Sequence, residues 1–213
     1  MSVLRKFVIT ALAMASAAFS LQAHAEVGYA DVVLDYHDSG AGPIAGPYGG
    51  IGAFTGYSPV TTDVVLGSEP GSIGYGDFLS LPTGSYVTVG FTDETAIDGV
   101  GDDIFIQETG ASGERANVYV SSDTINFVLL GVAADDETTA FDLASIGFTD
   151  PVRAIKIVGL DSLGASPGFD VVNVQVLPGS VAPPVPEPET IGMLLAGLGV
   201  ISVVARRRKQ ANK

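Results

Sequence analysis

The chain has 213 residues, no cysteine and a formal net charge of −14 at pH 7. The absence of cysteine excludes disulfides, thiolate metal sites and thiol nucleophiles. Between residues 26 and 185 three basic residues stand against 22 acidic ones. A surface this acidic repels nucleic acid and anionic lipid, and it favours solubility and divalent cations. That segment is long enough for one domain with a sizeable core.

The N-terminal 25 residues have the pattern of a secretory signal peptide. Positive charge at residues 5–6 precedes an apolar stretch over 7–21, and Ala23 and Ala25 form an A-x-A cleavage site before Glu26. The apolar stretch is short for a membrane span and ends in small residues. We therefore predict cleavage, with a mature protein that begins at Glu26. A retained membrane anchor is the alternative.

Residues 26–177 are predicted to form one all-β domain. They are rich in β-branched and aromatic residues, interrupted by Gly, Pro, Asp and Ser, which is typical of strands joined by turns. No stretch before the C-terminal tail sustains a helical period with caps. About eight to ten short strands at this spacing predict a β-sandwich of the jelly-roll type. The clearest candidate strands are residues 29–36, 62–66, 86–91, 104–107, 116–121, 127–131, 154–158 and 171–177.

Residues 39–59 interrupt this pattern as a long loop rich in glycine and proline. Loops of this length are usually functional or disordered. The loop contains Tyr48, Phe54 and Tyr57, which can stack on a sugar ring or pack down the loop itself. The chain has no Trp, which counts against a tryptophan-lined sugar cleft.

The densest group of carboxylates is Asp98, Asp102, Asp103 and Glu108, around a glycine-rich turn. Such a set of hard oxygen ligands suits Ca²⁺, and Asp170 can add a ligand if the last strand passes close by. Asp103 and Glu108 flank one strand and point to opposite faces if that strand is regular, so both can serve one ion only if it bends. A solvated acidic turn is the competing interpretation.

The chain carries a series of motifs at residues 98–108, 116–123 with Phe127, 141–143 and 168–170. In this order they resemble the extracellular β-sandwich modules of bacterial surface proteins. Two positions depart from the usual pattern: Thr124 stands where the modules have Gly, and Val172 stands where they often have a second Asp. The second departure weakens any transfer of a metal site. The resemblance implies an extracellular β-sandwich module.

Enzymatic chemistry has little support in the sequence. Once the signal peptide is removed, His37 is the only histidine, and no Gly-x-Ser-x-Gly elbow accompanies it. A pair of carboxylates for glycoside hydrolysis depends on three-dimensional spacing, so a secreted glycoside hydrolase stays open as a third function. We expect no enzyme activity.

The C-terminal tail has three parts after a Pro-rich linker over residues 178–190. Val185, Pro186, Glu187 and Pro188 precede an apolar run over 191–205, and a basic end follows at 206–213. The apolar run would rise about 22 Å as a helix, against about 30 Å of hydrocarbon, so it predicts a weakly held transmembrane helix. The basic cluster is expected on the cytoplasmic side.

This order resembles the PEP-CTERM sorting signal of Gram-negative envelope proteins. The resemblance implies a sorting transpeptidase of the exosortase type as partner, and an inner-membrane-anchored precursor that reaches the cell surface or the extracellular matrix. We therefore expect a non-enzymatic surface or polysaccharide-matrix protein. The alternative is a Ca²⁺-dependent carbohydrate-binding module that meets extracellular polysaccharide. No nucleic-acid partner is expected.

Overall fold

The computed structural model describes residues 27–50, 56–67, 77–110, 113–134, 138–182 and Leu198. The chain divides into two compact units, Met1–Ala182 and Pro183–Lys213. The predicted signal peptide, the Pro-Glu-Pro segment, the basic end and the apolar tail other than Leu198 lie outside the described residues. Among the residues that are described, no helix has the length and apolar character needed to cross a membrane.

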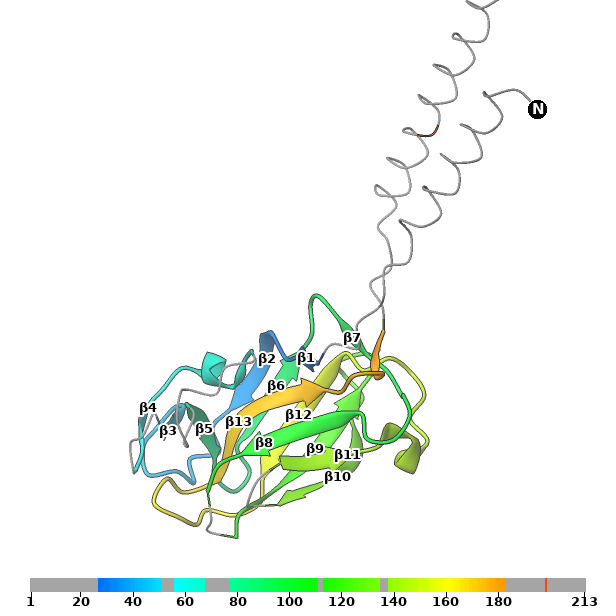
Figure 1. Ribbon diagram of the computed structural model, residues 1–213. Coiled ribbons are helices and arrows are strands. Elements are labelled where there is room, and N and C mark those ends of the chain that lie inside the picture. The colour runs from blue at the N-terminus through cyan, green and yellow to red at the C-terminus, as the bar shows by residue number, and fades with distance from the viewer. Residues whose placement is uncertain are drawn as a thin grey trace, which may run out of the picture. The chain divides into compact units, whose positions relative to one another are not determined.

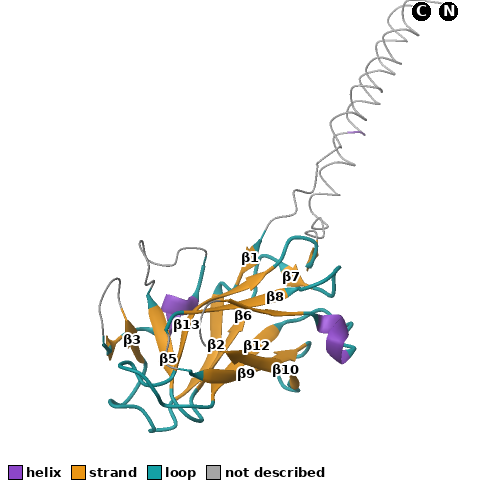
Figure 2. Cartoon of the chain, turned by 60° about the horizontal axis from the view of Figure 1, so that its bottom comes forward, coloured by secondary structure: helices purple, strands orange, loops and turns teal. Residues whose placement is uncertain are grey.

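The domain is a β-sandwich, as predicted, and all its strand pairs are antiparallel (Figures 1 and 2). The first sheet follows the order β11-β8-β13-β5-β3-β4, with β1 also paired to β13. Its strands are β1 (Gly28–Tyr29), β3 (Tyr48–Gly50), β4 (Ser58–Pro59), β5 (Phe78–Leu81), β8 (Ile104–Glu108), β11 (Thr138–Phe141) and β13 (Phe169–Val176).

The second sheet has five strands in the order β10-β9-β12-β6-β2, and a small third sheet pairs β14 with β7. Successive strands repeatedly change sheet, which is the connectivity of a jelly roll rather than of a simple meander. The strands are β2 (Val32–His37), β6 (Tyr86–Gly90), β9 (Arg115–Ser121), β10 (Val128–Ala134) and β12 (Ala154–Gly159), with β7 (Thr95–Ala96) and β14 (Val181–Ala182) in the small sheet.

The core lies between the two main sheets and follows the period-two alternation of the sequence. In β9 the buried Ala116, Val118 and Val120 alternate with more exposed neighbours. They join one hydrophobic cluster with Ile104 and Val174 of the opposite sheet. Because alternate side chains point to opposite faces, the outward side chains of a strand such as β9 are free to carry function.

The prediction of a strand over residues 62–66 is wrong. Thr62–Val65 forms a 3-10 helix, η1, closed by the Leu66 N–H donating to the Asp63 carbonyl at 3.0 Å. Its Val65 is fully buried in the core. The β-branched residues favour a strand locally, but the tight turn is the conformation that brings Val65 to the core. A second 3-10 helix, η2, spans Leu143–Ile146.

The long loop predicted over residues 39–59 contains β3 and β4. Asp38 closes its first half by accepting hydrogen bonds from the N–H groups of Gly40 and Gly46, at 2.8 and 2.7 Å. These bonds hold the pKa of the Asp38 carboxyl below its usual range. Tyr48 is completely buried and donates its hydroxyl to the Pro167 carbonyl, so it is part of the packing and offers no surface for a sugar.

The ordered domain also extends beyond the predicted boundary at residue 177. Val181 and Ala182 form β14, paired with Ala96 and Thr95 of β7. Ser180 is buried beside them. The first residues of the predicted linker are therefore part of the folded unit, because their backbone groups and the Ser180 hydroxyl have partners there.

Candidate functional site

The carboxylates predicted to form one site lie in two groups at opposite ends of β8. Asp98 and Asp103 lie at its start together with Asp142, and we call these three the first carboxylate cluster. Glu108 lies at its end. Glu108 is five positions along an extended strand from Asp103, a distance of about 16 Å, so one ion cannot bind both. Asp102 is exposed and belongs to neither group.

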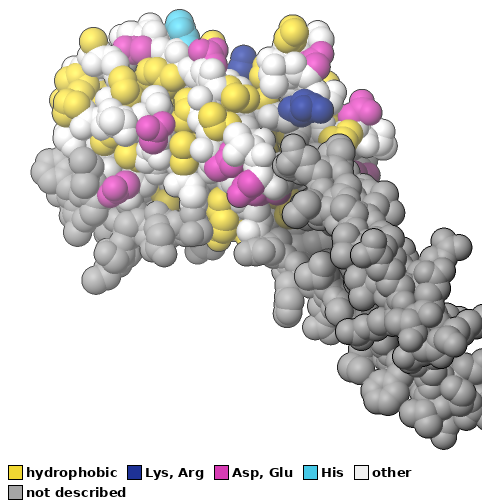
Figure 3. All heavy atoms as spheres, turned by 90° about the horizontal axis from the view of Figure 1, so that it is seen from above, with side chains coloured by type: hydrophobic (Ala, Val, Ile, Leu, Met, Phe, Trp, Pro, Cys, Tyr) yellow, Lys and Arg dark blue, Asp and Glu magenta, His cyan; other side chains and the backbone are white. Residues whose placement is uncertain are grey.

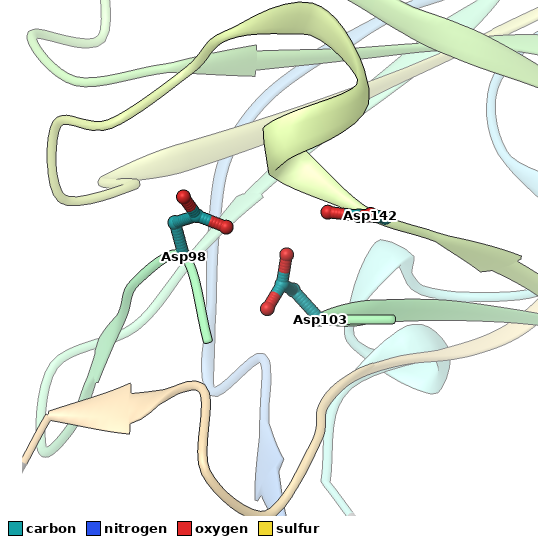
Figure 4. A group of neighbouring side chains, drawn as sticks. All are labelled: Asp98, Asp103 and Asp142. Carbon is teal, nitrogen blue, oxygen red and sulfur yellow. The ribbon is translucent and has the colours of Figure 1, made fainter. Parts of the chain in front are cut away.

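Three separate segments bring the first carboxylate cluster together. Asp98 comes from the loop between β7 and β8, Asp103 immediately precedes β8, and Asp142 follows β11. One oxygen of each carboxylate lies within 4.8 Å of the others. Figure 4 shows the three side chains directed toward a common space. Asp142 also caps η2 by accepting a hydrogen bond from the Ala144 N–H at 2.8 Å.

Asp103 is the structural centre of this cluster. It is fully buried, and its Oδ1 accepts hydrogen bonds from the Gly99 N–H at 2.7 Å and from the Ser180 hydroxyl at 2.5 Å. Its Oδ2 accepts from the Leu143 N–H at 2.8 Å. One carboxylate thus joins the turn before β8, the start of η2 and the end of the domain. Charge-assisted bonds of this kind are stronger than neutral ones.

Asp98 differs from Asp103, because one of its oxygens has no hydrogen-bond donor among the residues that the structure describes. Asp98 Oδ1 is buried and makes no hydrogen bond with any described residue. A buried carboxylate oxygen without a donor is unfavourable unless a cation or a proton satisfies it. Within the described part of the chain, no basic side chain pairs with the cluster; Arg115 pairs with Asp161 at 3.1 Å. The arrangement therefore fits a divalent cation bound by oxygen ligands.

The second carboxylate cluster consists of Glu108, Glu114 and Asp170. All three are at least nine-tenths buried, and one oxygen of each lies within 4.8 Å of the others. Glu114 Oε1 accepts from the Gly168 N–H at 2.8 Å, and Asp170 Oδ1 accepts from the Ser80 hydroxyl at 2.5 Å. Carboxylates this close can be accommodated by sharing protons or by binding a cation. Their burial keeps them from a polymeric substrate.

Two members of these clusters, Glu114 and Asp142, were not among the predicted ligands. Glu114 lies two residues before Ala116, so the alternation of β9 places it on the buried face. That alternation could have identified it as a buried carboxylate. Asp142 precedes Leu143 in the pattern of a helix N-cap, a structural signal that does not point to a ligand.

His37, the histidine singled out in the sequence, lies on the outer face of the five-stranded sheet. Its ring stacks on Tyr86, with centroids 5.2 Å apart. The Tyr86 hydroxyl donates to Asp35 Oδ2 at 2.9 Å, and this bond raises the pKa of Tyr86, which therefore stays protonated. Neither contact provides His37 with a nucleophile to activate, so the geometry offers no Ser-His-Asp relay here.

The C-terminal residues match a known sorting motif. Residues 184–209 match the family described as the PEP-CTERM protein-sorting motif. The chain carries a PEP-CTERM motif. It covers the predicted residues Val185, Pro186, Glu187 and Pro188 and the apolar and basic segments that follow. The PEP-CTERM motif supports an exported precursor that passes a membrane and is sorted.

The domain outside the PEP-CTERM motif has weaker likenesses. Comparison with curated proteins gives no match. Nine solved chains match, among them "CBM32 of AlyQ in complex with 4,5-unsaturated mannuronic acid". That match has 11% sequence identity and a TM-score of 0.35, and it covers 47% of this chain and 77% of the other. A likeness of this size carries no functional argument.

Proposed function

We propose that this chain is a non-enzymatic protein of the bacterial cell surface or extracellular matrix, delivered there through its C-terminal motif. The PEP-CTERM match at residues 184–209 is the observation that supports the proposal. The predicted signal peptide directs export, and a transpeptidase of the exosortase type then processes the tail. The burial of the second carboxylate cluster supports a non-catalytic domain, since those acids cannot reach a glycosidic bond.

Mass spectrometry of the mature protein tests this proposal. The full chain is expressed in a Gram-negative bacterium that processes PEP-CTERM proteins, beside a variant with Pro186→Ala, Glu187→Ala and Pro188→Ala. We expect the parent protein to begin at Glu26 and to lose the residues after the motif, whereas the variant keeps its tail and stays in the membrane fraction. Gln210→Ala, which lies beyond the matched residues, is the control. An unprocessed parent chain in the cytosol would refute the proposal.

We also propose that the first carboxylate cluster binds Ca²⁺ as a structural ion. The buried Oδ1 of Asp98 supports this, together with the two other carboxylates within 4.8 Å. Asp98 and Asp103 are ligands predicted from the sequence, and Asp142 completes the set. An ion here would tie the β7–β8 loop to the start of η2, so its effect is on stability.

Thermal unfolding of the full chain, with the sorting tail kept in detergent, tests the calcium site. Added Ca²⁺ is expected to raise the melting temperature and EDTA to lower it. Asp98→Asn should abolish this response without losing any protein hydrogen bond at Oδ1. Asp102→Asn, exposed and outside the cluster, should respond as the parent does. If the parent protein has the same melting temperature in Ca²⁺ and in EDTA, the site is disproved.

A further inference from the structure

The outer face of the five-stranded sheet carries a regular set of aromatic, polar and apolar side chains. Residues opposite one another on neighbouring strands point to the same face, so the strand register defines the rows of this surface. We call it the outer β2–β10 face. One row is His37, Tyr86, Val158, Asn117 and Val132, and the next is Asp35, Thr88, Lys156, Tyr119 and Leu129.

Contacts between these side chains hold the rings of the outer β2–β10 face in place. The Lys156 ammonium lies 4.5 Å from the centroid of Tyr86 and 4.2 Å from that of Phe127, which precedes β10. Tyr86 is further fixed by the stacked ring of His37 and by its bond to Asp35. Fixed rings bind a ligand with little loss of side-chain entropy.

A hollow of about 270 Å³ lies on this face, between the edge strand β2 and Phe127. Its volume is near the lower end of known ligand pockets, which suits a single ring of a larger molecule. It has opposite charges in Asp35 and Lys156, a hydroxyl in Thr88 and apolar surface in Leu34 and Phe127. The lining residues are Leu34, Asp35, Thr88, Thr124, Phe127 and Lys156.

Thr88 gives an independent indication that the hollow takes a ligand. Its side chain is 3% exposed, and its Oγ1 is buried without a hydrogen-bond partner among the described residues. A buried hydroxyl without a partner is unfavourable unless a group outside the protein forms a hydrogen bond with it. Valine has the same shape and would avoid that cost at this position.

The charges identify the class of molecule that fits. Lys156 and Asp35 balance each other, so the hollow itself favours neither sign. The domain around it is strongly acidic; on the face in Figure 3 acidic side chains outnumber basic ones. That field repels an anionic polymer. Aromatic faces beside hydroxyl, ammonium and carboxylate groups match a sugar ring, which has apolar faces and a rim of hydroxyls.

We propose that the outer β2–β10 face binds a neutral polysaccharide, with one sugar ring in the hollow against Thr88, Phe127 and Lys156. The proposal rests on the extracellular location argued above, since that is where the chain meets such polymers. The exposed Leu129 and Val132 extend the surface along the sheet toward neighbouring sugars. No metal ion is required at this site.

Affinity electrophoresis of the purified full-length protein tests the proposal. Native gels contain dextran, xylan, galactomannan or alginate, of which alginate is anionic. At least one neutral polymer should retard the parent protein. Thr88→Val removes one hydrogen bond and should weaken binding about tenfold, and Phe127→Ala should weaken it further. Tyr57→Ala, an exposed aromatic next to β4 in the other sheet, is the matched control and should bind as the parent does.

Each contrary result has a distinct meaning. Equal retardation of Thr88→Val and the parent would overturn the proposal, and so would retardation by alginate alone. If no polymer acts and ultracentrifugation shows a dimer that Phe127→Ala dissociates, the face joins two copies of the chain and the proposal is wrong. A protein that is correctly processed at its tail yet binds no neutral polymer disproves this site and leaves the proposed function standing.

Discussion

Replacement of Asp103 by Asn tests the structural role of the first carboxylate cluster. The Asn oxygen keeps the bonds from the Gly99 N–H and the Ser180 hydroxyl, but its NH₂ group then faces the Leu143 N–H across 2.8 Å. The change removes a bond to a charged acceptor, about 1.5–3 kcal/mol, and leaves two buried donors opposed. We expect a loss of about 3–5 kcal/mol in unfolding free energy, a large part of the roughly 5–15 kcal/mol of a typical domain.

Chemical unfolding in urea, monitored by circular dichroism, measures this loss. At roughly 2–4 °C per kcal/mol for a domain of this size, the melting temperature should fall by about 10 °C. The measurement is made in EDTA, so that any bound cation does not contribute. Asp102→Asn, the exposed neighbour, is the control and should lie within about 0.5 kcal/mol of the parent. If both variants are equally stable, the three hydrogen bonds of Asp103 do not organise this end of the domain.

Three further substitutions test other features of the fold. Burial, together with the neighbouring Asp93, raises the pKa of Glu94 from 4.5 to about 7. Because the unfolded chain releases this proton at a lower pH than the folded chain does, the stability of the parent protein should fall as the pH rises from about 4.5 to about 7. Glu94→Gln should therefore have a higher melting temperature than the parent above pH 7 but not below pH 4. Gly159→Ala places a Cβ 1.9 Å from the Leu81 carbonyl oxygen, so it should cost at least about 2 kcal/mol in a urea titration. Thr124→Gly should stabilise by up to about 1 kcal/mol, because the φ of Thr124 is +66° and β-branched residues are strained there; an unchanged or lower midpoint would contradict this.

The alternation of apolar residues predicted the sandwich and most of its strands. It worked best in β9 and β12, where one face is buried in the core and the other is not. The same period places Glu114 on the buried side, so the burial of this member of the second carboxylate cluster could be predicted from the sequence. The modules that this chain resembles usually have Gly at the position that matches Thr124. That preference agrees with the positive φ that Thr124 has in the structure.

The sequence was less informative where distant segments meet. It placed Asp98, Asp103, Glu108 and Asp170 in one candidate site, but the length of β8 separates them into two clusters. The outer β2–β10 face depends on the register of five strands, and that register brings together residues more than a hundred positions apart, such as Asp35 and Lys156. Local patterns do not contain this information, since strand pairing is decided by the whole fold.

The exit of the chain from the domain has a mechanical consequence. The last strand of the large sheet, β13, has eight residues and lies between β8 and β5, whereas the β14–β7 pairing that follows it has only two residues. A force that pulls on the chain beyond Ala182 would first peel the short pairing and release a little slack. It would then have to separate β13 from its three partners, β8, β5 and β1. The domain would thus extend by a short length at low force and then resist further extension until a higher force is reached.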